Sequence, residues 1–303
     1  MKRDVRRIIS NFLPFLLFIV GGIVIFEACF SGESKYEAIR IKGSDSEVNL
    51  VQVLAENFMD QDSLTSIGVT GGGSGAGISA LINGKTDLAN SSREITEEEL
   101  FYAEKRKIDP YPIIFALDAL AIIINENNPV DSLTISQLSQ IYSGKVSNWK
   151  EFGGNDEAIT LYGRQSSSGT FMYFRESIVK DEYSQSMIGM SGTAQIVDAI
   201  RTDKKGVGYV SSGYLNENVL RNLKVIKIKK DQNTPAYTPT VVENITSGHY
   251  PITRPLYQYA NGKPKGKLLE YLLYQFSPEG SEIIQSNGFY SIDTEKIKAE
   301  LTK

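Results

Sequence analysis

Apolar and polar positions alternate along the chain in blocks that predict strands and helices in turn. Ile39 and Ile41 have the two-residue spacing of a strand. From Val51 to Phe58 the apolar residues recur at i, i+3, i+4 and i+7, which marks one face of a helix. The same order returns farther along, as in a helix expected at 193–201 followed by a strand at 207–210. This alternation predicts an α/β fold with parallel strands.

Helix boundaries are marked by local capping signals. The segments Thr96–Glu99 and Thr134–Gln137 each place a threonine three residues before Glu or Gln, which is the capping-box pattern at a helix start. The second of these helices is expected to stop at Gly144, because glycine favours the residue after a helix end. Apolar spacing predicts two more helices, near 267–276 and 279–286.

Two apolar runs, Ile113 to Leu117 and Ala119 to Ile124, follow each other with Asp118 between them. They predict a pair of strands of the kind that a chain uses to cross between two lobes. Pro235 and Pro239 are predicted to flank the return crossing.

The segment Gly71 to Gly77 lies between a strand-like run and a helix-like run and contains five glycines and Ser74. Glycines reach positive φ without a Cβ clash, so several backbone N–H groups can converge on one point. The helix that follows adds its unpaired N-terminal amides and a partial positive charge. This loop therefore predicts a cradle for an anion.

Two further polar loops repeat this arrangement. Arg164 to Thr170 again follows a strand-like run and precedes a helix-like one, and it adds a guanidinium. Gly43 to Ser46 occupies the same place after the first predicted strand. Loops that offer backbone and hydroxyl donors, together with one arginine, predict that a tetrahedral oxyanion is held from two sides.

The first 28 residues are expected to be a targeting segment outside the fold. Four basic residues lie within the first seven, the stretch Phe12 to Phe26 is almost wholly apolar, and Cys29 follows. The pattern resembles a bacterial lipoprotein signal, which predicts lipidation of Cys29, a polar tether at 29–36 and a membrane-anchored location outside the cytoplasm. The alternative is an uncleaved membrane anchor.

Composition narrows the functional classes. The chain has 303 residues, enough for two lobes, and a net charge of −4, which argues against nucleic acid as a partner. An anion would have to be held by local donors, because the overall charge would not attract it. One cysteine allows no intrachain disulfide, and one histidine, His249, allows no His/Cys metal cluster. His249 is expected in a solvated loop.

Five blocks in this order and at these separations resemble the PstS family, the phosphate-binding receptors of the phosphate ABC transporter. The blocks are Gly43–Ser46, Gly71–Gly77, Thr86–Arg93, Leu133–Gly154 and Arg164–Thr170. The resemblance implies an α/β, two-lobe type II periplasmic-binding-protein fold with two crossover hinge strands. Carried over, lobe one is 37–117 plus 250–303 and lobe two is 118–249.

The resemblance also implies the ligand contacts and the partners. The family positions fall on nine residues of this chain: Asp45, Ser46, Ser74, Gly75, Ser92, Arg164, Ser168, Gly169 and Thr170. It implies a monomer that binds inorganic phosphate, delivers it to ABC permease subunits, catalyses no reaction and needs no cofactor or metal.

One position departs from the family pattern, because Ser92 stands where many members keep an aspartate that accepts the O–H of phosphate. We expect Asp45 to take over as the acceptor, since a buried carboxylate can bond to protonated phosphate but repels sulfate. The alternative is that Asp45 caps the helix that starts near Glu47. Ser92 also keeps open a receptor for molybdate, tungstate or sulfate.

Other interpretations stay open at this point. Arg164 could form a surface salt bridge, and Ser74, Ser168 and Thr170 could serve only as helix caps. The glycine loop loosely fits a dinucleotide pattern, which leaves a nucleotide-dependent enzyme as the less favoured class, since no supporting acidic residue follows in a convincing place.

Overall fold

The computed structural model describes residues 37–216 and 218–303. The expected signal at 1–28, the tether at 29–36 and the lipidation of Cys29 lie outside the described residues. In those two ranges no helix is both long and apolar enough to cross a membrane. Residues 38–303 form one compact unit.

A ten-stranded sheet runs through this unit in the described residues. Its strand order is β2-β1-β3-β10-β4-β8-β6-β7, and β9 pairs with both β4 and β5. Parallel pairs, such as β1 with β3 and β6 with β8, flank the antiparallel pairs that β4 makes with β10 and β8. The strands are β1 (Glu37–Gly43), β2 (Thr65–Thr70), β3 (Leu88–Ser91), β4 (Pro110–Asn125), β5 (Ser132–Thr134), β6 (Thr160–Arg164), β7 (Ile188–Met190), β8 (Gly206–Ser211), β9 (Leu223–Lys229) and β10 (Thr253–Asn261).

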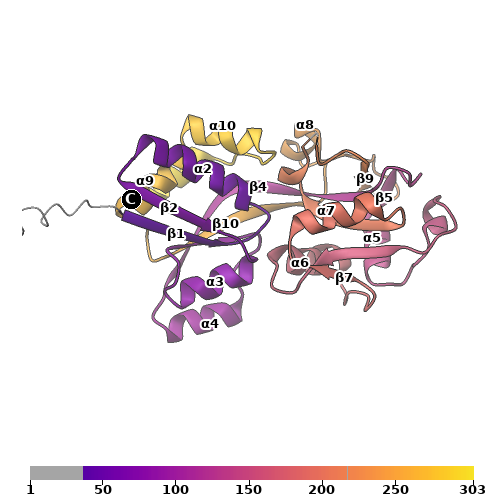
Figure 1. Ribbon diagram of the computed structural model, residues 1–303, viewed down its shortest axis with the longest axis horizontal. Helices are drawn as coiled ribbons and strands as arrows, with labels where there is room; N and C mark the ends of the chain where they lie inside the picture. Colours follow the sequence, from indigo (N-terminus) through magenta and orange to yellow (C-terminus); the bar gives the residue numbers. More distant parts are fainter. Residues whose placement is uncertain (1–36, 217) are drawn as a thin grey trace, which may run out of the picture. The chain divides into compact units, whose positions relative to one another are not determined.

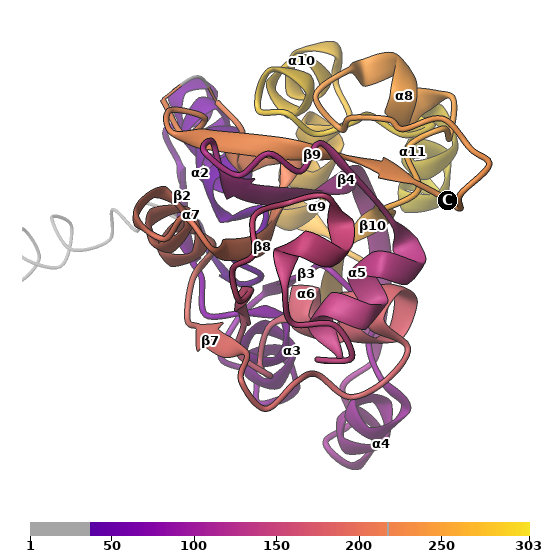
Figure 2. The same ribbon diagram turned by 90° about the vertical axis from the view of Figure 1, so that its right-hand side faces the viewer.

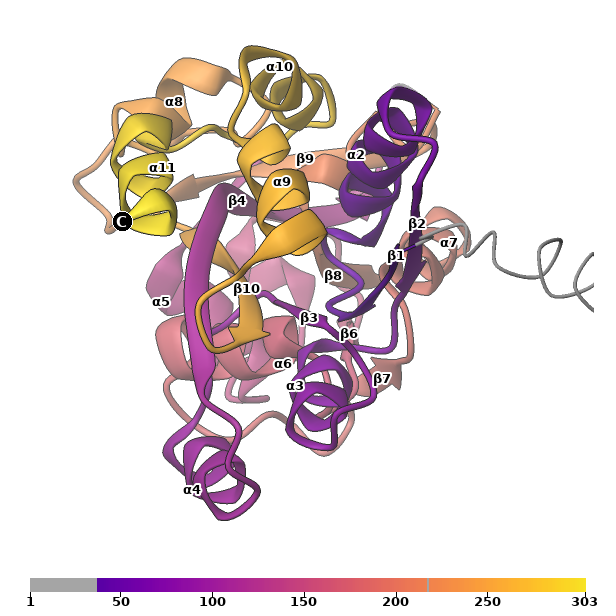
Figure 3. The ribbon, with the colours of Figure 1, turned by 90° about the vertical axis from the view of Figure 1, so that its left-hand side faces the viewer.

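Helices cover the sheet in two groups. In Figure 1, α2, α3, α4, α9 and α10 lie with β1 and β2, while α5, α6, α7 and α8 lie with β5, β7 and β9. Figure 3 shows α2, α9 and α10 together, in agreement with their mutual contacts. The helices are α2 (Val48–Gln61), α3 (Ser74–Ile82), α4 (Glu97–Lys105), α5 (Ile135–Tyr142), α6 (Gly169–Phe174), α7 (Thr193–Thr202), α8 (Val242–Thr246), α9 (Gly266–Gln275), α10 (Pro278–Ser286) and α11 (Thr294–Thr302), with short helical segments at η1 (Trp149–Phe152), η2 (Arg175–Val179) and η3 (Ser212–Tyr214).

The helix signals predicted from local sequence are confirmed. α4 and α5 both begin with complete capping boxes, built on Thr96 with Glu99 and on Thr134 with Gln137. The apolar face of α2 is buried. α7, α9 and α10 lie within one residue of the predicted limits. His249 is exposed, as expected of a solvated loop histidine.

The apolar core is divided along the chain. One cluster takes buried side chains such as Ile41 and Phe115 from residues before 117 and after 255, while another takes side chains such as Ile122 and Phe174 mainly from 119–252. In Figure 2 the elements of the second cluster, including α5 and α6, face the viewer. The lobe limits given above remain a prediction.

β4 and β10 connect these two parts of the core, and they correct two expectations. The runs on either side of Asp118 are not paired strands but one continuous strand, β4. The strand continues through Asp118 because the buried Asp118 carboxylate is paired with Arg254. The return crossing is β10 rather than the segment between Pro235 and Pro239, and it runs antiparallel to β4 with Arg254 opposite Asp118.

Candidate anion-binding site

The glycine-rich loop is a tight turn that leads into α3. Gly72 and Gly73 have φ values of 117° and 92°, which side chains rarely adopt. The helix begins directly after this turn, with Ser74 and Gly75 as its first two residues. Backbone amides at this position have no partner within the helix. The Gly75 amide donates to the Ser167 carbonyl at 3.1 Å, so this turn contacts the loop before α6.

The turn between β1 and α2 carries Asp45 and Ser46. Ser46 is buried, and its Oγ lies 2.9 Å from the Thr170 Oγ1 at the start of α6. The Ser46 amide donates to the Ser44 Oγ at 3.2 Å, which keeps the turn closed. Two hydroxyls far apart in sequence thus meet at one point.

The start of α6 and the residue before it carry three predicted contacts, Ser168, Gly169 and Thr170. Ser168 occupies the N-cap position of α6, and Gly169 and Thr170 form its first turn. Gly169 packs closely on the start of α3 and the end of β3, because a Cβ added there would overlap the Ser74 Oγ and lie 2.8 Å from the Ser92 Oγ. Only a residue without a side chain permits this approach.

Arg164 ends β6, with its side chain only 3% exposed, and pairs with Asp45 across the two loops. Its Nη2 lies 2.5 Å from the Asp45 Oδ2, and it also donates from Nη1 to Thr193 Oγ1 at 3.1 Å. The other Asp45 oxygen accepts from the Gly72 amide at 2.9 Å. The interpretation of Arg164 as an exposed surface salt bridge is therefore wrong.

The capping alternatives also fail on geometry. The N-cap residue of α2 is Glu47, and no side chain caps that helix, so Asp45 is not its cap. The N-cap residue of α3 is Gly73, and Ser168 makes no side-chain capping bond to α6. Because these polar side chains do not cap, their hydroxyl and carboxylate groups are available for other contacts.

Ser92, directly after β3, is buried against Ser74. Its amide donates to the Ser74 Oγ at 3.1 Å, and the two hydroxyl oxygens lie 3.3 Å apart. The contacts above thus bring the three predicted donor loops together with Ser92, while their contact with an anion remains a prediction.

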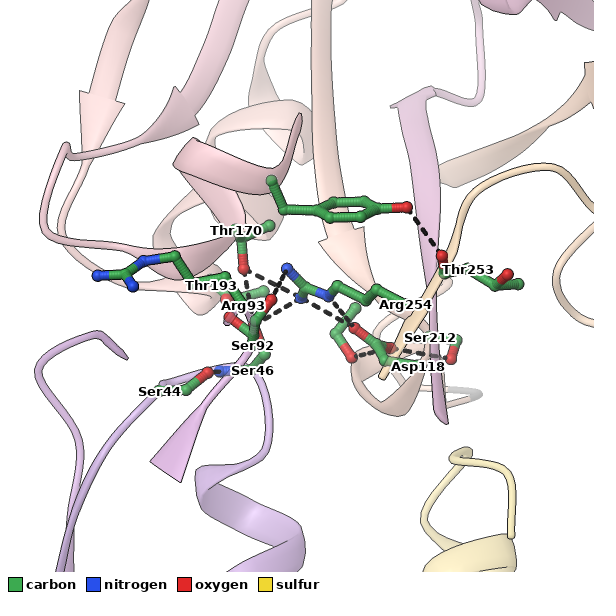
Figure 4. Close-up of polar contacts among 12 residues, drawn as sticks. Ser44, Ser46, Ser92, Arg93, Asp118, Thr170, Thr193, Ser212, Thr253 and Arg254 are labelled. Carbon is green, nitrogen blue, oxygen red and sulfur yellow. Dashed lines mark hydrogen bonds and ion pairs between the residues drawn. The ribbon is translucent and has the colours of Figure 1, made fainter. Parts of the chain in front are cut away.

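A buried ion pair that the sequence reasoning missed lies beneath these turns. Arg254 of β10 donates to Asp118 Oδ2 from Nε at 3.1 Å and from Nη2 at 2.9 Å. Both side chains are essentially inaccessible. Figure 4 shows the Arg254 guanidinium between Asp118 on one side and Ser46, Ser92 and Thr170 on the other. Burial raises the pKa of Asp118, and the Arg254 charge offsets part of this effect.

A second buried acid, Glu47, adjoins this pair. Its side chain is fully buried, and neither carboxyl oxygen has a hydrogen-bond partner among the described residues. Burial raises the Glu47 pKa from 4.5 to about 8, although Ser44 and Arg254 act in the opposite direction. Burial therefore favours the protonated, neutral form of Glu47.

A sequence signal for the ion pair did exist. Asp118 interrupts an otherwise apolar run, and an isolated acid in a buried strand requires a cationic partner. The sequence does not show which cationic residue pairs with Asp118, because Arg254 lies 136 residues away.

Comparisons with known proteins agree with this architecture. Residues 30–279 match the model of the PBP superfamily domain. The phosphate-binding protein PstS of Staphylococcus epidermidis is 30% identical over 296 residues, covering 93% of this chain and 90% of that protein. PstS of Bacillus subtilis is 27% identical and covers 95% and 96%.

Solved structures of phosphate-binding receptors also resemble this chain. A putative phosphate ABC transporter substrate-binding protein from Clostridium perfringens, with bound phosphate, superimposes with a TM-score of 0.74 at 26% identity, covering 85% of this chain and all of that one. An ABC-type phosphate transport receptor from Vibrio cholerae gives 0.66 at 28% identity, covering 84% of this chain and all of that one. The predicted two-lobe type II periplasmic-binding-protein fold is confirmed, with β4 and β10 as its crossing strands. The chain belongs to the PstS family of phosphate-binding proteins.

Proposed function

We propose that this chain is an extracytoplasmic phosphate receptor that captures inorganic phosphate between its two lobes and delivers it to an ABC permease. One observation carries the proposal: four polar segments contact one another, through the Arg164–Asp45 pair, the Ser46–Thr170 contact, the Gly72 amide on Asp45 and the Ser74–Ser92 contact. Relatives named phosphate-binding protein and a solved relative with bound phosphate support the choice of anion.

The donors suit a dehydrated tetrahedral anion. Arg164 Nη2 donates to Asp45 and to the Ser191 carbonyl, and Nη1 donates to Thr193, so the Nε–H group is left for an anion. Charge-assisted bonds are about twice as strong as neutral ones. The hydroxyls of Ser46, Ser74, Ser168 and Thr170 are buried, so their bonds strengthen when water is excluded. Micromolar binding needs about 8 kcal/mol, which several such bonds can supply.

Asp45 is the proposed acceptor for the proton of the ligand. Its carboxylate already accepts from Arg164 and from the Gly72 amide, and a carboxylate has about four acceptor sites, so capacity remains. An acceptor of this kind favours protonated phosphate over sulfate, molybdate and tungstate. Ser92 stands in place of the aspartate common in the family and cannot act as a carboxylate acceptor. Asp45, which is paired directly with Arg164, is therefore proposed for this role.

Calorimetry of the purified full chain against phosphate, sulfate and molybdate tests the proposal. We expect micromolar or tighter phosphate binding and at least about a hundredfold weaker sulfate binding. Asp45→Asn should reduce the preference for phosphate over sulfate, because the asparagine amide can donate a hydrogen bond to sulfate. Tighter binding of molybdate or sulfate than of phosphate would instead indicate a receptor for another oxyanion.

The proposal extends to the cellular role of the chain. We infer a monomeric binding protein without catalytic activity, whose closed form docks on the permease. The apolar stretch before Cys29 supports attachment to the outer face of the membrane through a lipid on that cysteine. Mass spectrometry of the mature N-terminus would detect a diacylglyceryl group on Cys29, and an unmodified cysteine would contradict the anchor.

A further inference from the structure

The hydroxyl of Tyr214 contacts the turn that carries Asp45. Tyr214 ends the short helical segment η3, and its Oη donates to the Asp45 carbonyl at 2.8 Å. Burial raises the Tyr214 pKa to about 12, and the nearby Asp45 charge acts in the same direction. The hydroxyl therefore keeps its hydrogen throughout the neutral range and is the donor of this bond.

The segment η3 is held in place independently of this bond. Ser211, the last residue of β8, donates from its Oγ to Asp118 Oδ1 of β4 at 2.6 Å. Gly213 packs on the Phe289 ring, because a Cβ added at Gly213 would overlap two of the ring carbons. Tyr214 thus extends from a segment that is anchored both to β4 and to the turn after α10.

The bond joins two parts of the chain that meet at the proposed site. Asp45 belongs to predicted lobe one and Tyr214 to predicted lobe two. Other contacts at the site join the same two parts, namely Arg164 with Asp45, Ser46 with Thr170, and the Gly75 amide with the Ser167 carbonyl. Each of these includes a side chain or an amide that is proposed to bind the anion. The Tyr214 bond differs, because it uses the main-chain carbonyl of Asp45, and a carbonyl oxygen cannot donate to an anion.

Such a bond favours the arrangement in which the two parts are in contact. It forms when the Asp45 turn and η3 lie side by side, and a separation of the predicted lobes would break it. The apparent affinity of a ligand scales with the population of the binding-competent form. A ligand held between the two parts therefore gains from a contact that favours this closed arrangement, even where the contact does not touch the ligand.

We propose that Tyr214 is a positioning residue that holds the Asp45 turn against the other half of the site and thereby slows the release of the bound anion. The inference rests on the proposed function, because it concerns the retention of the same ligand. It assigns Tyr214 no contact with the anion. Recognition of the anion stays with the groups described above, and Tyr214 acts through the main chain of Asp45.

Two consequences separate this role from recognition of the anion. Loss of the Tyr214 hydroxyl should weaken phosphate and sulfate binding by the same factor, because the bond is independent of which anion is held. A residue that set the direction of the Asp45 carboxylate would instead change the preference between the two anions. Affinity differences among variants of one site arise mainly in the dissociation rate, so the anion should leave faster.

The test compares the full chain with Tyr214→Phe, which removes one oxygen atom and keeps the ring. Tyr142→Phe is the matched control, because the Tyr142 hydroxyl also donates to a main-chain carbonyl, that of Tyr162 at 3.2 Å, within predicted lobe two. Calorimetry measures the affinity of each protein for phosphate and for sulfate. Rapid filtration measures the release of radiolabelled phosphate into an excess of unlabelled phosphate. For Tyr214→Phe we expect release to be roughly two- to tenfold faster and both affinities to fall by that factor, as for the loss of one ordinary hydrogen bond.

Three results would overturn the inference while leaving the proposed function intact. Unchanged phosphate release by Tyr214→Phe would make the hydroxyl a packing group only. A loss of phosphate affinity without an equal loss of sulfate affinity would show that Tyr214 acts on the choice of anion. Equally fast release by Tyr142→Phe would show that loss of any buried hydroxyl has this effect. Absence of phosphate binding by the unmodified chain would reject the proposed function itself.

Discussion

Replacement of Glu47 by glutamine should remove a large part of the pH dependence of stability. The Glu47 carboxyl is completely buried, and burial raises its pKa from 4.5 to about 8. Glutamine has nearly the same shape as the protonated acid but cannot ionise. The variant therefore separates the cost of a buried charge from the cost of a buried polar group.

The sign of the effect follows from proton linkage. Between pH 4.5 and about 8 the folded chain keeps a proton on Glu47 that the unfolded chain has lost. The free energy of unfolding therefore falls as pH rises through this interval and levels off above the folded pKa. At about 1.4 kcal/mol per pKa unit, the total change is at most about 5 kcal/mol.

Urea unfolding of the full chain, followed by circular dichroism at several pH values, measures this change. We expect the two proteins to agree within about 1 kcal/mol near pH 5, and Glu47→Gln to be more stable by several kcal/mol near pH 9. Glu282→Gln, the same change at an exposed site in α10, should follow the unmodified chain at every pH. Parallel curves for Glu47→Gln and the unmodified chain would refute the reasoning.

Two further substitutions test the proposed ligand contacts. Arg164→Lys keeps the charge but loses the planar pair of donors, so phosphate affinity should fall roughly ten- to a hundredfold in calorimetry; unchanged affinity would exclude a contact from Arg164. Gly169→Ala should weaken phosphate binding without lowering the melting temperature, because its Cβ would overlap Ser74 and hold the lobes apart. Gly192→Ala, with open space around its Cβ, is the control, and equal effects of both alanines would contradict this explanation.

Local sequence signals predicted much of the fold. Capping boxes and apolar faces are decided within a few residues of the chain, and α4 and α5 begin where these signals place them. The glycine-rich loop was equally readable, because positive φ at Gly72 and Gly73 is a local property. The loops that were predicted as donors are accordingly the ones that meet in the structure.

Features decided by distant partners were predicted poorly. The apolar runs on either side of Asp118 predict two strands, whereas Asp118 is paired with Arg254 and β4 continues through it. The place of the return crossing depends on the same pairing, since Arg254 lies opposite Asp118 in the sheet. Helix and strand periodicity carries no information about which two charges meet.

The charge balance of the proposed site explains how an acidic chain can hold an anion. Arg164 is paired with Asp45 and Arg254 with Asp118, so each guanidinium already has a carboxylate partner. With a net charge of −4, the chain as a whole does not attract phosphate either. Binding energy must therefore come from hydrogen bonds donated by hydroxyls, by backbone amides and by guanidinium N–H groups such as Arg164 Nε–H, which has no partner among the described residues.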